Sequence, residues 1–214
     1  MIWVKSLAVF RAEMLWITAL CCRAACSTRS IFQVQLTASA MASINKVVGR
    51  YHDFHTPAAG GNKDHEHGFL LSDEHFTSID FPDSVTTDAW KITDGGDIVG
   101  DWSSNGNFYV HGYILHAGHF TSFDFSDSRL TASRKINTSG QMIGIYQSKL
   151  LNGGTSNPGR EHGFVLVNGS YSSFDFPGSA LTDGSAINDA GLIVGGYSDS
   201  GGKRHGYTAV LRQD

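Results

Sequence analysis

One phrase recurs along this chain, and its repetition constrains the fold more than any other feature. HGFLLSDEHFTSIDFP (67–82) returns as HGYILHAGHFTSFDFS (111–126) and HGFVLVNGSYSSFDFP (162–177), and a shortened copy, HGYTAVL (205–211), follows. The histidines that open the four copies are spaced by 44, 51 and 43 residues. Self-similarity at a fixed period of roughly 20 to 50 residues predicts a repeat architecture.

A second phrase lies between the copies of the first. It reads AWKITDGGDIVGDW (89–102), SRKINTSGQMIGIY (133–146) and SAINDAGLIVGGY (185–197), with a shortened form, SINKVVGRY (43–51), ahead of them. Each full copy contains a turn that ends in glycine, the residue that most readily adopts the left-handed backbone of a type I turn with a bulge.

Each unit is interpreted as four short strands. In the first unit these are Gly68–Leu71, Phe76–Phe81, a strand that ends at Ile92, and Asp97–Asp101. The chain is rich in glycine, and only 17% of its residues are charged, as is typical of a turn-dense all-β protein. Four antiparallel strands in such a unit predict an all-β, β-propeller-like repeat protein, because stacked units bury faces that one sheet exposes.

The two ends of the chain predict how the repeat closes. The last copy stops after a first strand, whereas Ile31–Leu36 alternates like a second strand and residues 43–51 supply a shortened third and fourth. We therefore expect four blades of four antiparallel strands, with the termini sharing one blade and leaving no open edge. An open β-solenoid and a fragment of a larger ring are the alternatives.

Residues 1–30 differ from the repeat and are interpreted as a leader, ahead of a β-repeat domain at 31–214. A lysine, a short apolar run and two alanines follow one another in the order of a secretory signal peptide. The apolar run of about nine residues is shorter than the roughly 20 that span a bilayer. We expect export, with a mis-assigned start or a disordered tail as the alternatives.

Charge and cysteine content exclude several classes of protein. The net charge is −4 and the isoelectric point about 6.2, whereas a nucleic-acid surface needs clustered lysine and arginine. All three cysteines lie in the leader, so the repeat body uses neither disulfides nor cysteine ligands for zinc.

The phrases HGF-[LV]-L, DFP and IN-x-x-G-x-IVG-x-Y, which together extend over about residues 43–211, resemble the HAF-type extracellular repeat family of bacterial proteins. The resemblance implies an exported, repetitive β-protein and no settled chemistry. The chain departs from the family pattern in having glycine where the family name has alanine, and in lacking a tryptophan at the end of the first strand. No catalytic residues can be carried over from the family.

Recurring polar residues form two candidate ligand-binding sets. If the units follow ring symmetry, each set lies around the axis, where carboxylates suit Ca²⁺ and imidazoles suit zinc. The alternative is structural, with each histidine capping a strand end and each aspartate fixing a turn or crossing to that histidine. The residues are His67, His111, His162, His205, Asp80, Asp124 and Asp175.

The loop before the first copy contains the densest cluster of metal-ligand side chains in the chain. Two loops, the one before the first copy and the one before the third, are longer than their counterparts, and the first of them is rich in histidine and acidic residues. The spacing matches no established zinc motif, so a solvated, histidine-rich loop is the alternative to a Ca²⁺ or Zn²⁺ site. The candidate metal ligands are His52, Asp53, His55, Asp64 and His65.

Two functions remain open at this stage. The sequence contains no G-x-S-x-G, H-E-x-x-H or Walker A motif, which favours a binding protein for a small molecule, a glycan, a cell-envelope component or another protein. The alternative is a metal-dependent hydrolase of esters or lactones, with Ca²⁺ as a candidate metal, in which the bound metal activates water.

Overall fold

The computed structural model describes residues 18–19, 32–35, 46–53, 65–73, 75–104, 109–148 and 160–212. These residues form β-strands and turns, with no helix among them. The strands are β1 (Thr18–Ala19), β2 (Phe32–Gln35), β3 (Lys46–Asp53), β4 (His65–Ser72), β5 (His75–Ile79), β6 (Thr86–Ile92), β7 (Ile98–Ser103), β8 (His111–His116), β9 (His119–Phe123), β10 (Ser128–Ile136), β11 (Met142–Ser148), β12 (Glu161–Val167), β13 (Ser170–Phe174), β14 (Leu181–Ile187), β15 (Leu192–Ser198) and β16 (Arg204–Val210).

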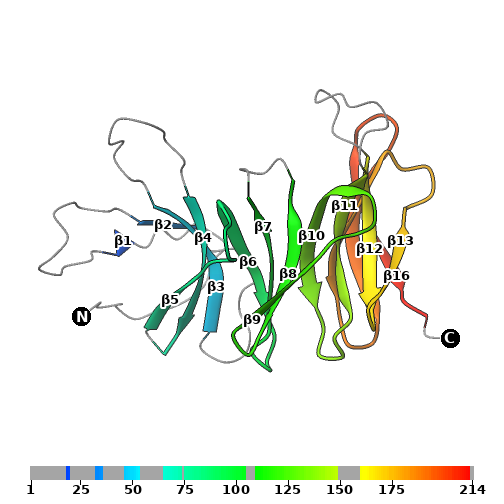
Figure 1. The fold of residues 1–214 in the computed structure, drawn as a ribbon. Coiled ribbons are helices and arrows are strands. Elements are labelled where there is room, and N and C mark those ends of the chain that lie inside the picture. Colours follow the sequence, from blue (N-terminus) through cyan, green and yellow to red (C-terminus); the bar gives the residue numbers. More distant parts are fainter. Residues whose placement is uncertain are drawn as a thin grey trace, which may run out of the picture.

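Antiparallel pairing groups the strands into four successive sheets that stand in chain order, as Figure 1 shows. The first sheet is β2–β3–β4–β5, to which β1 adds at the β2 edge, the second is β6 to β9, the third is β10 to β13, and the last is β14 to β16. Single parallel bridges join the first sheet to the second, at Glu66 and Thr86, and the second to the third, at Val110 and Leu130.

The all-β prediction is confirmed, but the predicted grouping of strands is wrong by half a unit. Each sheet combines the two strands of a second phrase with the two strands of the following first phrase, as β6 and β7 combine with β8 and β9. The reason is that the DFP segment is a crossing loop: it leads from the last strand of one sheet to the first strand of the next.

Hydrogen bonds within this crossing loop recur in all three copies. A phenylalanine N–H donates to the hydroxyl of a fully buried threonine six residues later, and the same hydroxyl contacts a serine in the loop. The phenylalanine–threonine pairs are Phe81–Thr87, Phe125–Thr131 and Phe176–Thr182, each at 3.0 Å.

The predicted shared blade is not formed in this structure. Instead, β2 pairs with β3, while β16 pairs with β15 in the last sheet, and the two strands lie at opposite ends of the row (Figure 1). The β2–β3 pairing closes a far shorter loop than a pairing of β2 with β16 would, and its entropic cost is correspondingly smaller. The described strands therefore show an open row of sheets rather than a closed wheel.

The glycine turns of the second phrase are confirmed. Gly96, Gly140 and Gly191 have φ angles of 93°, 76° and 73°, which side-chain-bearing residues rarely adopt. Asn168 and Gly169 likewise both have positive φ in the hairpin turn between β12 and β13, as a two-residue hairpin loop requires.

The core lies between neighbouring sheets. The first strand of each sheet packs over the two middle strands of the sheet before it: β6 over β3 and β4, β10 over β7 and β8, and β14 over β11 and β12. Val48, Val99 and Ile143 occupy equivalent positions on the covered faces of the first three sheets, and all three are 0% exposed. Burial of this apolar surface holds the row of sheets together.

Candidate functional site

Three of the four predicted histidines form hydrogen bonds with the three predicted aspartates. In each pair the histidine lies near the start of the third strand of its sheet, and the aspartate follows the fourth strand of the same sheet. The Nδ1-to-carboxylate distances are 2.6 Å for His67 and Asp80, 2.9 Å for His111 and Asp124, and 2.9 Å for His162 and Asp175.

His205 differs because the last sheet, as described, has no fourth strand. It bonds through Nε2, at 2.9 Å, to Asp199, which lies in the turn just before its own strand.

Each of these histidines also stacks on an aromatic ring of the neighbouring strand. The ring centroids are 5.0 Å apart for Tyr51 and His67, 4.7 Å for Trp102 and His111, 5.0 Å for Tyr146 and His162, and 4.9 Å for Tyr197 and His205. Three of these aromatic rings also stack on the phenylalanine of the preceding crossing loop. The ring centroids are 4.1 Å apart for Phe81 and Trp102, 3.8 Å for Phe125 and Tyr146, and 3.7 Å for Phe176 and Tyr197.

These contacts form a continuous series that crosses from sheet to sheet. Asp124 is followed by Phe125, which stacks on Tyr146; this ring stacks on His162, which bonds Asp175. Each predicted histidine therefore forms a hydrogen bond with an aspartate of its own sheet. The four histidines lie in four different sheets and do not meet at a single site. Their predicted ligand-binding role stays a prediction.

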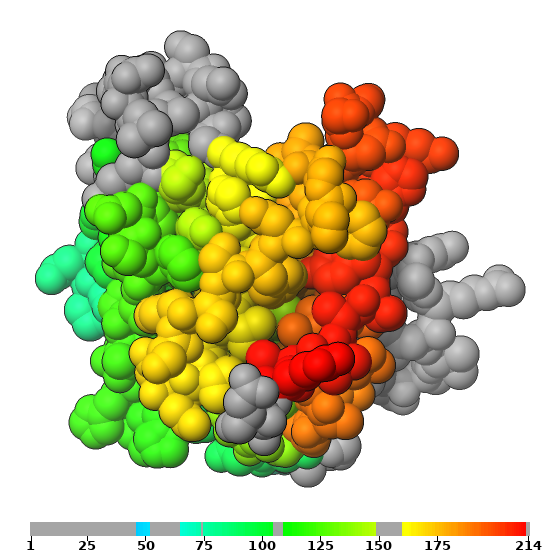
Figure 2. Space-filling model, turned by 90° about the vertical axis from the view of Figure 1, so that its right-hand side faces the viewer, coloured from blue at the N-terminus to red at the C-terminus, as the bar shows by residue number. Residues whose placement is uncertain are grey.

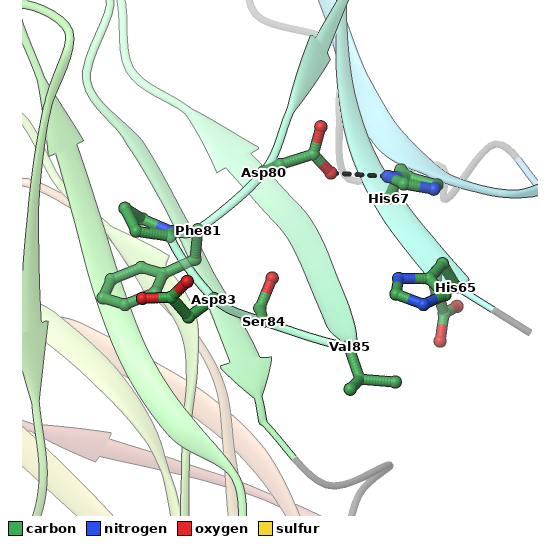
Figure 3. Close-up of a pocket in the computed structure, with 9 residues that line it drawn as sticks. His65, His67, Asp80, Phe81, Asp83, Ser84 and Val85 are labelled. Carbon is green, nitrogen blue, oxygen red and sulfur yellow. Dashed lines mark hydrogen bonds and ion pairs between the residues drawn. The ribbon is translucent and has the colours of Figure 1, made fainter. Parts of the chain in front are cut away.

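The first sheet carries a pocket that incorporates one of these pairs. Figure 3 shows His67 and Asp80 on one side of it, with His65 at the start of β4 and Asp83 and Ser84 in the crossing loop. The pocket has a volume of about 250 Å³, and Glu66 also lines it. The rings of His65 and His67 lie 6.1 Å apart with planes tilted by 22°, so two imidazoles and several carboxylates share one hollow.

The other units lack one of these pocket residues, the histidine at the position of His65. The two residues before the histidine are His65 and Glu66 in the first unit, but tyrosine and valine in the second, arginine and glutamate in the third, and lysine and arginine in the last. The His–Asp pair therefore recurs, whereas the second imidazole beside it occurs in the first unit alone.

Behind Glu66 lies a buried charged cluster that the sequence reasoning missed. Arg50 contacts the Glu66 carboxylate at 2.9 Å and reaches across to Asp88 of the second sheet at 3.5 Å. Asp101 accepts a 2.6 Å hydrogen bond from the indole N–H of Trp90. Asp88, Asp101 and Glu66 are 6%, 8% and 7% exposed.

Burial controls the protonation of this cluster. Desolvation, followed by repulsion from Asp101 and Glu66, raises the pKa of Asp88 to about 8, although Arg50 opposes the shift. Burial also raises the pKa of Asp101, against the hydrogen bond from Trp90 and the charge of Arg134. A carboxyl that stays protonated near neutral pH can donate as well as accept a hydrogen bond.

The predicted metal loop is only partly described. The pairing of β3 with β4 places Asp53 opposite His65 and His52 opposite Glu66, so these residues flank the same hairpin. His55 and Asp64 lie outside the described residues. Among the side chains that the structure describes, no three His, Cys, Asp or Glu residues group closely enough to hold a metal ion.

Fold and site together define an all-β repeat protein in which consecutive antiparallel sheets carry recurring His–Asp pairs and one acidic, imidazole-bearing pocket. Across the described ranges there is no helix of the length and apolarity needed to cross a membrane.

Comparisons with known proteins add one structural likeness. No protein-family model and no curated protein sequence matches the chain. A solved structure titled "Streptogramin B lyase structure" is similar to it with a TM-score of 0.38 and 17% sequence identity. The match covers 82% of this chain and 58% of the other, so this chain spans less than two thirds of that protein's length.

Proposed function

We propose that this chain is an exported repeat protein that binds a polyhydroxyl ligand of the glycan class in the pocket of its first sheet. The observation that supports the proposal is the combination of His65, His67 and the neighbouring carboxylates in a hollow of about 250 Å³. Most residues of this pocket recur in other units, and the feature that sets the first unit apart is the second imidazole, at His65.

The chemistry of the pocket favours hydroxyl groups over anions. Carboxylates of Glu66, Asp80 and Asp83 accept hydrogen bonds and imidazoles donate or accept, and the described lining contains no lysine or arginine. Phe81 adds an aromatic group to the lining, which suits the apolar face of a sugar ring. A phosphate or nucleic-acid ligand would be repelled by the three carboxylates of this pocket.

A glycan array followed by calorimetry with the best ligand tests this proposal. We expect His65→Ala to weaken binding at least tenfold, because the variant removes an imidazole from the pocket and leaves the His67–Asp80 hydrogen bond intact. His111→Ala is the matched control: it breaks the equivalent pair in the second sheet, away from the pocket, and should leave affinity unchanged. An array without hits, or equal affinity of the His65 variant, would contradict the proposal.

Metal-dependent hydrolysis of esters or lactones is the second candidate, because the β3–β4 register brings Asp53 opposite His65. A metal at this hairpin could activate water. Metal analysis of the purified protein, with ester and lactone assays in the presence and absence of EDTA, tests it. Metal-free protein that is inactive on a broad panel would exclude this candidate.

Export is a separate proposal that rests on the composition of residues 1–30. Expression in a bacterial host, followed by cell fractionation and N-terminal sequencing, should find the protein outside the cytoplasm with the leader removed. Cytoplasmic protein that retains its leader would contradict export.

A further inference from the structure

The last sheet is one strand shorter than the others in the part of the chain that is described. In the first three sheets, the strand that contains the repeat histidine pairs on its outer side with β5, β9 or β13. Among the described strands, its counterpart in the last sheet, β16, pairs with β15 alone. Figure 2 views the molecule from this end and shows β16 residues at the surface, in red.

In the complete sheets the outer strand ends in Ser-Phe-Asp or Ser-Ile-Asp and makes three recurring contacts there. The serine hydroxyl forms a hydrogen bond with an aromatic side chain on the second strand of the same sheet: Ser78 with Tyr51 at 3.1 Å, Ser122 with Trp102 at 2.9 Å, and Ser173 with Tyr146 at 2.8 Å. The aspartate forms the hydrogen bond with the repeat histidine.

The middle residue of the tripeptide covers a glycine. A Cβ atom added at Gly163 would lie 2.4 Å from the ring of Phe174, and one added at Gly112 would lie 2.3 Å from the ring of Phe123. The absence of a side chain at the glycine thus makes room for the phenylalanine ring of the outer strand.

The last sheet has all three receiving groups. Tyr197 and His205 stack on each other as their counterparts do, and His205 bonds Asp199 by Nε2. Among the described atoms, a Cβ at Gly206 would meet just the carbonyl oxygen of Gly195, at 3.9 Å. No described side chain therefore covers this glycine. Val210 on the same strand is 65% exposed.

We propose that the outer edge of β16 is an acceptor for an extended partner strand that contains Ser-Phe-Asp. The partner would run antiparallel to β16 and place its phenylalanine over Gly206, its serine at the Tyr197 hydroxyl and its aspartate at His205. Main-chain hydrogen bonds supply affinity in this form of strand addition, and the side chains supply specificity. This site is distinct from the glycan pocket, which lies in the first sheet.

A labelled peptide with the sequence of residues 168–177, NGSYSSFDFP, tests the proposal by fluorescence anisotropy with the full chain. We expect saturable binding that falls at least tenfold when the first phenylalanine of the peptide is replaced by alanine, and several-fold when its aspartate is replaced by asparagine. Absence of saturable binding, or equal binding of the alanine peptide, would overturn the proposal.

Variants of the chain locate the site. Gly206→Val should abolish peptide binding, yet it should leave the thermal unfolding temperature unchanged, because open space surrounds that position. Tyr197→Phe removes the hydroxyl while keeping the ring stack, and should weaken binding several-fold. Asp199→Asn weakens the hydrogen bond that His205 makes within the chain. This frees His205 for the aspartate of the peptide and should tighten binding. Undiminished binding by the Gly206 variant would refute the assignment.

Discussion

The interface between the third and last sheets and the interface between the first and second are built on equivalent strands but filled with different chemistry. The former packs around one buried apolar cluster, Ile143, Val165, Ile187 and Ile193, and its carboxylate at Asp183 forms an ion pair with the exposed Arg204. The latter combines apolar packing with buried acidic groups, among which Arg50 links Glu66 to Asp88. Equivalent strands of this fold can therefore pack through either kind of interface.

The two interfaces are expected to differ in how much they contribute to stability. Apolar burial stabilises in proportion to the area removed from water, whereas a buried ion pair often contributes little net stability because both partners are desolvated. The charged interface adjoins the pocket through Glu66. We infer that the polar groups of the first two sheets are retained at some expense of stability near the candidate site.

The largest expected effect is at the apolar interface. Ile143→Ala removes a side chain that is 0% exposed, and we expect a loss of about 2–5 kcal/mol in the free energy of unfolding. Val194 occupies the equivalent position in the last sheet but is 40% exposed, so Val194→Ala should lose less than about 1 kcal/mol. Chemical denaturation measures both. Equal losses would show that the outer face of the last sheet is covered in solution.

The same comparison explains what the sequence could predict about the fold. Alternating strands and glycine turns were predictable because both follow from local backbone preferences. The grouping of strands into sheets was not, because a hairpin turn and a crossing loop have similar Gly, Ser and Asp content. The buried Thr87, which accepts from the Phe81 N–H, is the residue type that distinguishes the crossing loop.

The candidate site was only partly predictable. Recurrence identified the His–Asp pairs, since a residue kept in every unit is visible in one sequence. Asp88 and Asp101 were missed because neither recurs in every unit. An alignment of the sheets would have found them, since Asp101 stands where the third sheet has Ile145 and Asp88 where it has Ala132.

An intermediate effect is expected at the charged interface, and it depends on pH. The folded protein keeps a proton on Asp88 up to about pH 8, whereas the unfolded chain releases it near pH 4. Between these values the folded state binds more protons, so this group's contribution to stability is greatest at low pH and falls as the pH rises.

Asp88→Asn tests this effect because the amide imitates the protonated carboxyl. The variant should be more stable than the parent at pH 8 by on the order of 1–3 kcal/mol, and the two should converge near pH 4. Thermal unfolding across this range checks it. A variant that is less stable at pH 8 would show that the ionised carboxylate contributes to the ion pair with Arg50.

The smallest effect is expected at the recurring pairs themselves. Asp124 is 47% exposed in its pair with His111, and exposed pairs typically contribute about 0–1 kcal/mol. Asp124→Asn should therefore lower the free energy of unfolding by less than about 1 kcal/mol, well below the loss for Ile143→Ala. Denaturation of the two variants under identical conditions gives the ratio. A loss that equals that of the Ile143 variant would mean that the His–Asp series, rather than the apolar interface, holds neighbouring sheets together.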